Sequence, residues 1–157
     1  MAKRLRELFE ADQGDRVGRG KDWNNPTFVE GVIQRDKERR KEVQGLIDGG
    51  KLVSAEDYYH AAMIFQHGDN ADDYLKANEL ARKAMELGDI RAPWLVAASC
   101  DRYLIHSGHS QQKYGTQYRK NSEGKFELVA VDPSTTDEER ASLGLPPLAE
   151  INKFMER

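Results

Sequence analysis

Cysteine is almost missing from this sequence, which has 157 residues and contains only Cys100. A single cysteine cannot form an internal disulfide, and it cannot build a thiolate cage around a metal ion. Chains without disulfides are typical of reducing compartments, so we expect a cytoplasmic protein. Cys100 itself lies in an apolar helical segment, where we expect the thiol to contribute to core packing.

Long apolar runs are also missing, and neither sign of charge dominates. No segment approaches the roughly 20 apolar residues that cross a bilayer, and the start, MAKRLRELFEADQ, lacks the apolar core of a signal peptide. The 24 Lys and Arg against 27 Asp and Glu give a formal net charge of -3. We therefore expect no membrane span and no nucleic-acid partner.

The residues that are present favour a folded helical protein. Hydrophobic residues make up 38% and charged residues 32% of the chain. This composition is polar, but the apolar residues recur at helical spacing, which indicates a packed core. We predict one mainly α-helical domain over residues 1–157, with about six helices and one small β-hairpin in the C-terminal third.

Capping residues and apolar spacing locate these elements. Helices are predicted at 3–13, 28–48, 55–67, 71–87, 91–106, 137–142 and 148–155, and strands at 115–120 and 125–131. The helix pair 74–87 and 91–106 has the small-residue packing of tetratricopeptide or Sel1-like hairpins. No second full copy follows at a fixed period, so we do not predict a repeat array. Residues 14–26 form a loop, which Trp23 is expected to pin to the body.

Charged residues interrupt the apolar faces of several predicted helices. An unpaired buried ion costs several kcal/mol, roughly, even after the protein relaxes. We therefore expect carboxylates and arginines from separate helices to meet inside the fold, with imidazoles nearby. The residues concerned are Asp12, Asp36, Arg40, Asp101 and Arg102, with Arg16 just past the first helix and His60 and His67 on the third.

This charged cluster has two interpretations. In the first, it is a structural ion network that fixes the register of the helices. In the second, it lines a polar pocket in which carboxylates and imidazoles carry out acid–base chemistry. Two histidines on one helical face favour the pocket, because imidazole titrates near neutral pH.

A metal site is the weaker hypothesis. His60 and His67 are seven residues apart, or about 10.5 Å along a helix, which is too far for both to bind one ion directly. Asp57 and His60 stand at i, i+3 and could share an ion, but no matching Glu-x-x-His pair occurs elsewhere. We therefore expect neither a metal ion nor another cofactor.

The loop that ends in Tyr114-Gly115-Thr116-Gln117 carries amides, a phenol and a hydroxyl, and Gln111 precedes it. Such groups orient a polar ligand through hydrogen bonds. The alternative is an ordinary entry into a strand, with a bulge at Gly115.

Six motifs follow one another between Leu5 and Leu148. They are Asp12-Gln13-Gly14-Asp15-Arg16, Gln66-His67-Gly68, Asp101-Arg102-Tyr103-Leu104, Gln111, Tyr114-Gly115-Thr116-Gln117 and Gly144-Leu145-Pro146-Pro147. Their order resembles a bacterial family known only as a domain of unknown function, and Tyr-Gly-Thr-Gln is the most specific of them. The resemblance implies no reaction. It singles out Asp12, Arg16, His67, Asp101, Arg102, Gln111, Tyr114 and Gln117, which overlap the residues found from helical geometry.

From these observations we expect a small cofactor-independent enzyme that acts on a polar, anionic small molecule or peptide group by hydrolysis, elimination or isomerisation. His67 is expected to be the general acid or base, oriented by Asp101 or Asp12, and His60 is a further catalytic candidate. Candidate binding residues are Arg16, Asp36, Arg40, Arg102, Gln66, Gln111, Tyr114, Thr116 and Gln117. The alternative is a non-catalytic, tetratricopeptide-like interaction module with a structural ion network. The sequence leaves the oligomeric state open.

Overall fold

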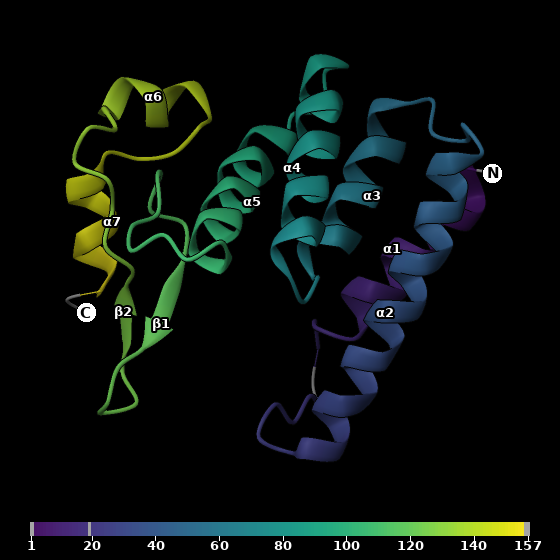
Figure 1. The fold of residues 1–157 in the computed structure, drawn as a ribbon, viewed down its shortest axis with the longest axis horizontal. Helices are drawn as coiled ribbons and strands as arrows, with labels where there is room; N and C mark the ends of the chain where they lie inside the picture. The colour runs from purple at the N-terminus through teal and green to yellow at the C-terminus, as the bar shows by residue number, and fades with distance from the viewer. Residues whose placement is uncertain (1, 19, 156–157) are drawn as a thin grey trace.

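The computed structural model of this protein describes residues 2–18 and 20–155. Within these residues the chain forms seven helices and one two-stranded antiparallel sheet, so it is mainly helical, as predicted. The elements are α1 (Ala2–Gly14), α2 (Pro26–Asp48), α3 (Ala55–Gln66), α4 (Ala71–Glu86), α5 (Ala92–His106), β1 (Tyr118–Lys120), β2 (Phe126–Leu128), α6 (Asp137–Ser142) and α7 (Leu148–Met155). Figure 1 shows α1 and α2 at one end, α3 to α5 in the middle, and the hairpin with α6 and α7 at the other end.

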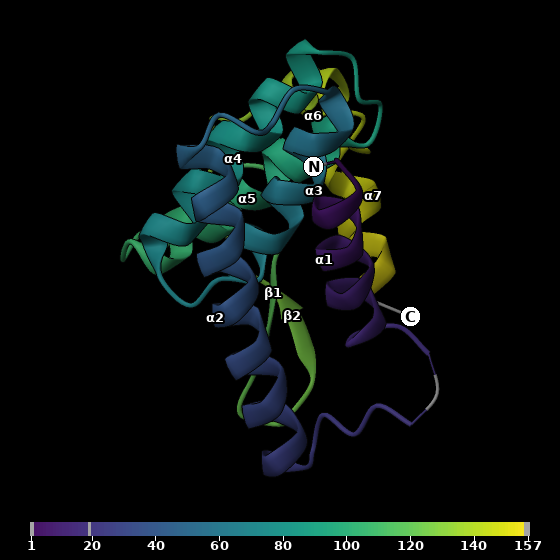
Figure 2. The same ribbon diagram turned by 90° about the vertical axis from the view of Figure 1, so that its right-hand side faces the viewer.

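Helices α3, α4 and α5 pack against one another and form the centre of the core. Small side chains allow the close approach: Ala61 on α3, Ala77 on α4 and Ala97 on α5 are fully buried. Helices α1 and α2 pack on α3 and contribute Leu5 and Val43 to the same core. Figure 2 shows α1 and α2 lying side by side over this face.

The helix ends are fixed by side chains that the sequence supplies locally. Ser54 and Asp57 form a capping box that begins α3, and the side chain of Asn70 caps α4. Helix α3 ends at Gln66 with His67 as its C-cap, and His67 is only three residues before the cap of α4. His67 and Gly68 therefore lie in a tight turn between two buried helices, which holds the imidazole in a fixed place.

The β-hairpin is shorter than predicted. Tyr118 pairs with Leu128 and Lys120 with Phe126, so each strand has only three residues. The prediction began the first strand at residue 115 and ended the second at 131. It fails at residues 115–116 because their backbone N–H groups donate to the carboxylate of Asp101 and not to a neighbouring strand.

A buried arginine fastens the C-terminal segment to the loop before the hairpin. The Nε of Arg140 donates to the carbonyl of Tyr114 at 3.1 Å, and its Nη1 donates to the carbonyl of Thr135 at 3.1 Å. The same loop needs a glycine at position 115, where φ is +96° and a side chain would face Ile151 at 3.5 Å.

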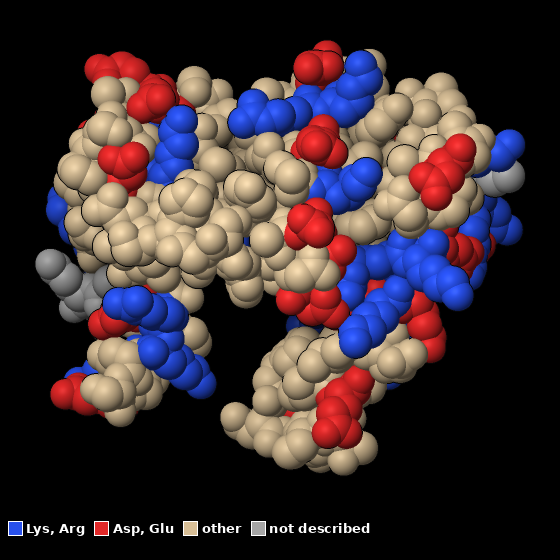
Figure 3. Space-filling view, viewed as in Figure 1, with Lys and Arg blue, Asp and Glu red and all other residues tan. Residues whose placement is uncertain are grey.

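Figure 3 shows acidic and basic side chains interleaved on one face of the molecule. A notch separates the hairpin from the N-terminal part of α2 on this face. Among the described helices, none combines the length and the apolar composition that a bilayer crossing requires.

Candidate functional site

The buried carboxylate of Asp12 contacts the imidazole of His67. Its Oδ1 and Oδ2 lie 2.9 and 3.0 Å from the Nδ1 of His67, although the two residues are 55 positions apart. Gln13 donates to Oδ2 at 2.9 Å, and Arg16 donates to Oδ1 at 3.1 Å. Asp12 is fully buried, so the surrounding donors hold its carboxylate in one orientation.

A second carboxylate, Asp36 of α2, joins α1 to α2 through the same arginine. Arg16 donates to both oxygens of Asp36, at 3.2 and 2.7 Å, and Arg39 donates to one of them at 2.7 Å. Arg39 also reaches Asp15 at 2.7 Å. Burial alone would raise the pKa of Asp15, but hydrogen bonds from Arg35 and Arg39 outweigh it and lower the pKa.

Arg40 fastens the turn that carries His67 to α2. Its Nη1 donates to the backbone carbonyl of His67 at 2.9 Å, and its Nη2 donates to Asp69 at 3.0 Å. Its Nε lies 3.2 Å from Asp73 at the start of α4. The predicted binding residue Arg40 is thus paired, and it positions the backbone of the His67 turn.

Asp101 lies elsewhere in the fold and does not contact His67. Its fully buried carboxylate accepts five hydrogen bonds, four from backbone N–H groups and one from a hydroxyl, at 2.7 to 3.1 Å. The donors are Lys113, Tyr114, Gly115 and Thr116. The choice between Asp12 and Asp101 as partner of His67 is therefore decided for Asp12, and the catalytic role predicted for Asp101 does not fit the structure. Every oxygen of this carboxylate is used by the loop.

The Tyr-Gly-Thr-Gln motif instead connects Asp101 to Arg102. The hydroxyl of Thr116 donates to Asp101 and accepts from the side-chain amide of Gln117 at 3.0 Å. The amide oxygen of Gln117 accepts from the Nε of Arg102 at 3.2 Å, and the Nη1 of Arg102 donates to the carbonyl of Gln66 at 2.6 Å. The motif thus orients an arginine.

Arg102 differs from the other arginines of the site because its partners are neutral. Among the described residues, no carboxylate pairs with it. Burial lowers the pKa of Arg102, and the charge of Arg16 lowers it further, against an opposing effect of Tyr74. The Tyr74 ring lies 5.6 Å from the centre of the guanidinium. A buried cation is costly without an anion nearby.

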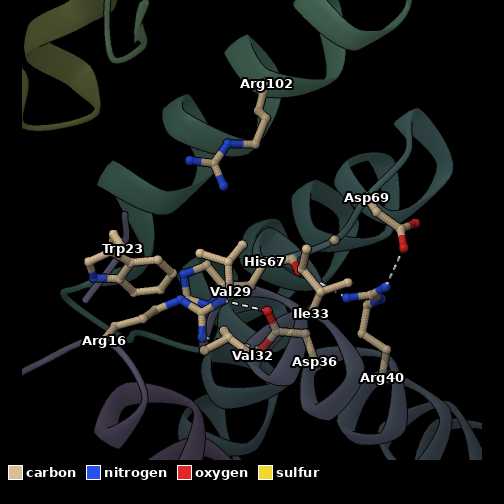
Figure 4. A pocket seen from close by; sticks show the side chains of 11 residues that line it. Arg16, Trp23, Val29, Val32, Ile33, Asp36, Arg40, His67, Asp69 and Arg102 are labelled. Carbon is tan, nitrogen blue, oxygen red and sulfur yellow. Dashed lines mark hydrogen bonds and ion pairs between the residues drawn. The ribbon is translucent and has the colours of Figure 1, made fainter. Parts of the chain in front are cut away.

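These groups surround a pocket of about 240 Å³. Figure 4 shows Arg102 reaching down from α5 toward Arg16, Trp23 and His67, while Arg40 turns aside toward Asp69. Apolar residues of α2 complete the lining. The full set is Arg16, Trp23, Val29, Val32, Ile33, Asp36, Arg40, His67, Gly68, Asp69 and Arg102.

Several predicted site residues do not line this pocket. His60 lies two turns before His67, and its ring stacks on Phe9 at 4.1 Å between α1 and α3. Gln111 is exposed beside a different hollow, and Tyr114 is packed in the core. Gln66 and Thr116 do not line the pocket: the backbone carbonyl of Gln66 accepts from Arg102, and the hydroxyl of Thr116 bonds Asp101 and Gln117. The prediction of one cluster was wrong on these points, because residues that share a helical face two turns apart contact different neighbouring helices.

The structure also adds residues that the sequence analysis did not assign to the site. Trp23, Val29 and Ile33 line the pocket, and Asp69 pairs with Arg40 at its rim. Val29 and Ile33 stand at apolar positions of α2, and their spacing alone does not distinguish pocket residues from core residues. Trp23 was expected to pin the loop, and it contacts Phe28 edge-to-face at 5.2 Å.

Comparison with known proteins found no relative of this chain. No protein-family model, no curated protein and no solved structure matches the chain. The resemblance to a bacterial domain family therefore stays a prediction. Within the described residues, no three His, Cys, Asp or Glu side chains form a group that could hold a metal ion.

Proposed function

We propose that this protein is a small enzyme that works without a cofactor and transfers a proton between His67 and a polar, anionic small molecule or peptide group. Hydrolysis, elimination and isomerisation all use such a step. His67 is the general acid or base, and Asp12 orients it. Arg16 and Arg102 face the anionic part of the substrate, and Gln117 positions Arg102.

The observation that carries this proposal is the arrangement of the two imidazole nitrogens. The Nδ1 of His67 faces the carboxylate of Asp12, and an ionised carboxylate can only accept, so we assign the proton of the neutral imidazole to Nδ1. Nε2 then keeps its lone pair and has no protein partner among the described residues. The side chain of His67 is 17% exposed and lines the pocket. A carboxylate–imidazole pair whose imidazole lines a pocket is an arrangement that general bases use.

The first test is catalytic. Esters, amides and phosphate esters with an anionic group, together with β-elimination substrates, would be assayed with the parent, His67→Ala and Asp12→Asn. Loss of a positioned general base lowers the rate by about 10² to 10⁴-fold, so we expect His67→Ala to lose at least ~100-fold. The control is His109→Ala, an exposed histidine outside the pocket, which keeps the parental rate. Folded His67→Ala and Asp12→Asn proteins that work at the parental rate would contradict the proposal.

The second test needs no substrate. Two-dimensional NMR of the ¹⁵N-labelled imidazole distinguishes the two neutral tautomers of His67. We expect the proton on Nδ1 and a lone pair on Nε2, and we expect Asp12→Asn to shift the population toward the other tautomer. A proton on Nε2 in the parent protein would remove the proposed base.

The other candidate function is a non-catalytic interaction module, and exposed apolar residues favour it. Leu87, Ile90 and Trp94 follow one another from the end of α4 to the start of α5, and Ile90 is 94% exposed. The test compares Ile90→Glu with His67→Ala in cells that lack the native protein. An interaction module fails to complement with Ile90→Glu and complements with His67→Ala. The enzyme gives the opposite result.

A further inference from the structure

The pocket beside His67 has one cationic wall and one apolar wall. We infer that it binds an amphipathic anion, meaning a small molecule in which one carboxylate or phosphate is attached to a single flat apolar body. This inference deepens the proposed function, because the anion would be the substrate presented to His67.

The charge of the pocket requires an anion. The two carboxylates in its lining are already paired: Asp36 with Arg16 and Arg39, and Asp69 with Arg40. Arg102 is left with neutral partners, and its guanidinium faces the pocket (Figure 4). The positive charge of Arg16 disfavours the charged form of Arg102. A bound carboxylate or phosphate would offset the repulsion between Arg16 and Arg102. It would also accept hydrogen bonds from an arginine that is already oriented.

The opposite wall requires an apolar body. Trp23 and Ile33 are 48% and 47% exposed, although both are large apolar side chains. The half-buried Val29 and the buried Val32 also line this wall. Figure 4 shows the Trp23 ring beside Arg16, with Val29, Val32 and Ile33 next to it. A flat ring on Trp23 would gain the stacking and burial that this surface lacks without a ligand.

The size of the pocket suits a body of a single ring. Its volume is about 240 Å³, and a cavity of roughly 150 Å³ is enough to hold benzene. The remaining space suits one short acidic group. Phenylacetate and phenyl phosphate are therefore suitable probes: they share the ring and differ in the anion and in the atom that links it to the ring.

The sequence offers a direct optical test, because its two tryptophans are Trp23 and Trp94. Trp94 lies outside this pocket and beside another hollow. In a Trp94→Phe background, the fluorescence of Trp23 would be followed during titration with each probe. The same titrations would be done with benzyl alcohol, which lacks the charge, and with acetate and inorganic phosphate, which lack the ring.

We expect a saturable change in Trp23 emission with at least one of the two aryl anions, at least ~10-fold tighter than with benzyl alcohol or with the small anions. Whichever probe binds more tightly identifies the anionic group. Equal affinity for benzyl alcohol would overturn the cationic half of the inference, and equal affinity for acetate or phosphate would overturn the apolar half. No binding by either aryl anion at millimolar concentration would overturn the whole inference.

Two variants locate the binding. Arg102→Gln should weaken binding of the aryl anion at least ~10-fold. Arg82 is an exposed arginine of α4 outside the pocket, and Arg82→Gln should leave the affinity unchanged. Because Arg102→Gln could disturb the fold, Ile33→Glu provides a second test: it places a like charge on the exposed wall. Its matched control is Gln34→Glu, one residue further on α2 and outside the pocket lining. Unchanged affinity in Arg102→Gln and Ile33→Glu would exclude this pocket.

The binding test and the catalytic test have independent outcomes. If His67→Ala binds the aryl anion with parental affinity, the pocket is an anion site whether or not His67 is a base. If catalysis depends on His67 but no aryl anion binds, the proposed function survives and the substrate class inferred from the pocket is wrong.

Discussion

Single residues in this protein have their role decided by the groups that face them. Asp12 and Asp101 are both fully buried carboxylates on the apolar faces of their helices. Asp12 faces an imidazole and two arginines, whereas Asp101 faces four backbone N–H groups and a hydroxyl. The first arrangement can move a proton, and the second builds a loop.

We predict that Asp101→Asn destabilises the protein by about 3 kcal/mol. The new amide nitrogen would face backbone N–H donors, and leaving buried polar groups without partners costs ≈ 1–3 kcal/mol each. Urea unfolding followed by circular dichroism measures the change. The control is Asp72→Asn, an exposed carboxylate in the first turn of α4, which should change stability by less than ~1 kcal/mol. Equal effects of the two substitutions would contradict this role of Asp101.

Gly68 is also a residue with a specific steric role. A Cβ on Gly68 would lie 2.3 Å from the Cβ of Asp73, and Asp73 pairs with Arg40. We predict that Gly68→Ala lowers the free energy of unfolding by about 2 kcal/mol, within the range found for overpacking. Gly45→Ala in α2 is the matched control, because nothing lies within 4 Å of that position.

The control should change stability in the other direction. Replacing an exposed helical glycine by alanine stabilises by roughly 0.5–1 kcal/mol. Thermal unfolding of both variants decides the prediction: a Gly68→Ala protein as stable as Gly45→Ala would show that the turn can shift to make room.

At the scale of helices, the contact between α1 and α3 contains a buried histidine. The ring of His60 stacks on Phe9, at 14° between the planes. Burial lowers the pKa of His60; nearby Glu56 raises it by less, and Arg91 and Arg6 lower it further. The imidazole is therefore held neutral, so it serves as a packing group between two helices.

This pKa predicts how stability depends on pH. The folded pKa of His60 lies below the unfolded value of about 6.5. Its contribution to stability is thus fully present above pH ~6.5 and is lost as the pH falls through the folded pKa, because the unfolded chain takes up the proton first. We expect the parent protein to lose stability between pH 7.5 and 5 more steeply than His60→Gln does.

The measurement is urea unfolding at a series of pH values. His109→Gln is the control, since His109 is exposed and lies outside the contact between α1 and α3. His106 is unsuitable as a control, because burial and the charge of Arg102 lower its pKa too. Parallel pH profiles for the parent and His60→Gln would contradict the prediction.

At the scale of the whole molecule, burial decreases from the middle toward the hairpin. Helices α3, α4 and α5 share a continuous buried core, whereas the β1 residues Tyr118, Arg119 and Lys120 are exposed. Two-stranded ribbons are marginally stable by themselves. We predict that backbone amides in α3 to α5 exchange with solvent most slowly and that those of the hairpin exchange at least ~100-fold faster, as measured by hydrogen exchange. If the hairpin amides exchanged as slowly as those of α3 to α5, the prediction would be contradicted.

Local sequence predicted much of the fold and only part of the site. The helix boundaries followed from caps such as Ser54 and from apolar spacing, because these signals act within a few residues. The pair Asp12 and Arg16, four residues apart, was accessible for the same reason. Trp94 stands at helical spacing with the apolar residues of α5, yet it is 52% exposed and borders a hollow that Gly115 and Ile151 also line. Apolar spacing alone therefore did not determine burial.

The sequence by itself determined that helices form, where they begin, and that their charged residues need partners, since these depend on local backbone geometry and on the cost of burying an ion. The tertiary structure decided which partners meet. It placed Asp12 beside His67 across 55 residues, gave Asp101 to a loop, and left Arg102 without a carboxylate partner among the described residues. Pairing over such distances depends on how the helices pack, and their periodicity does not encode it.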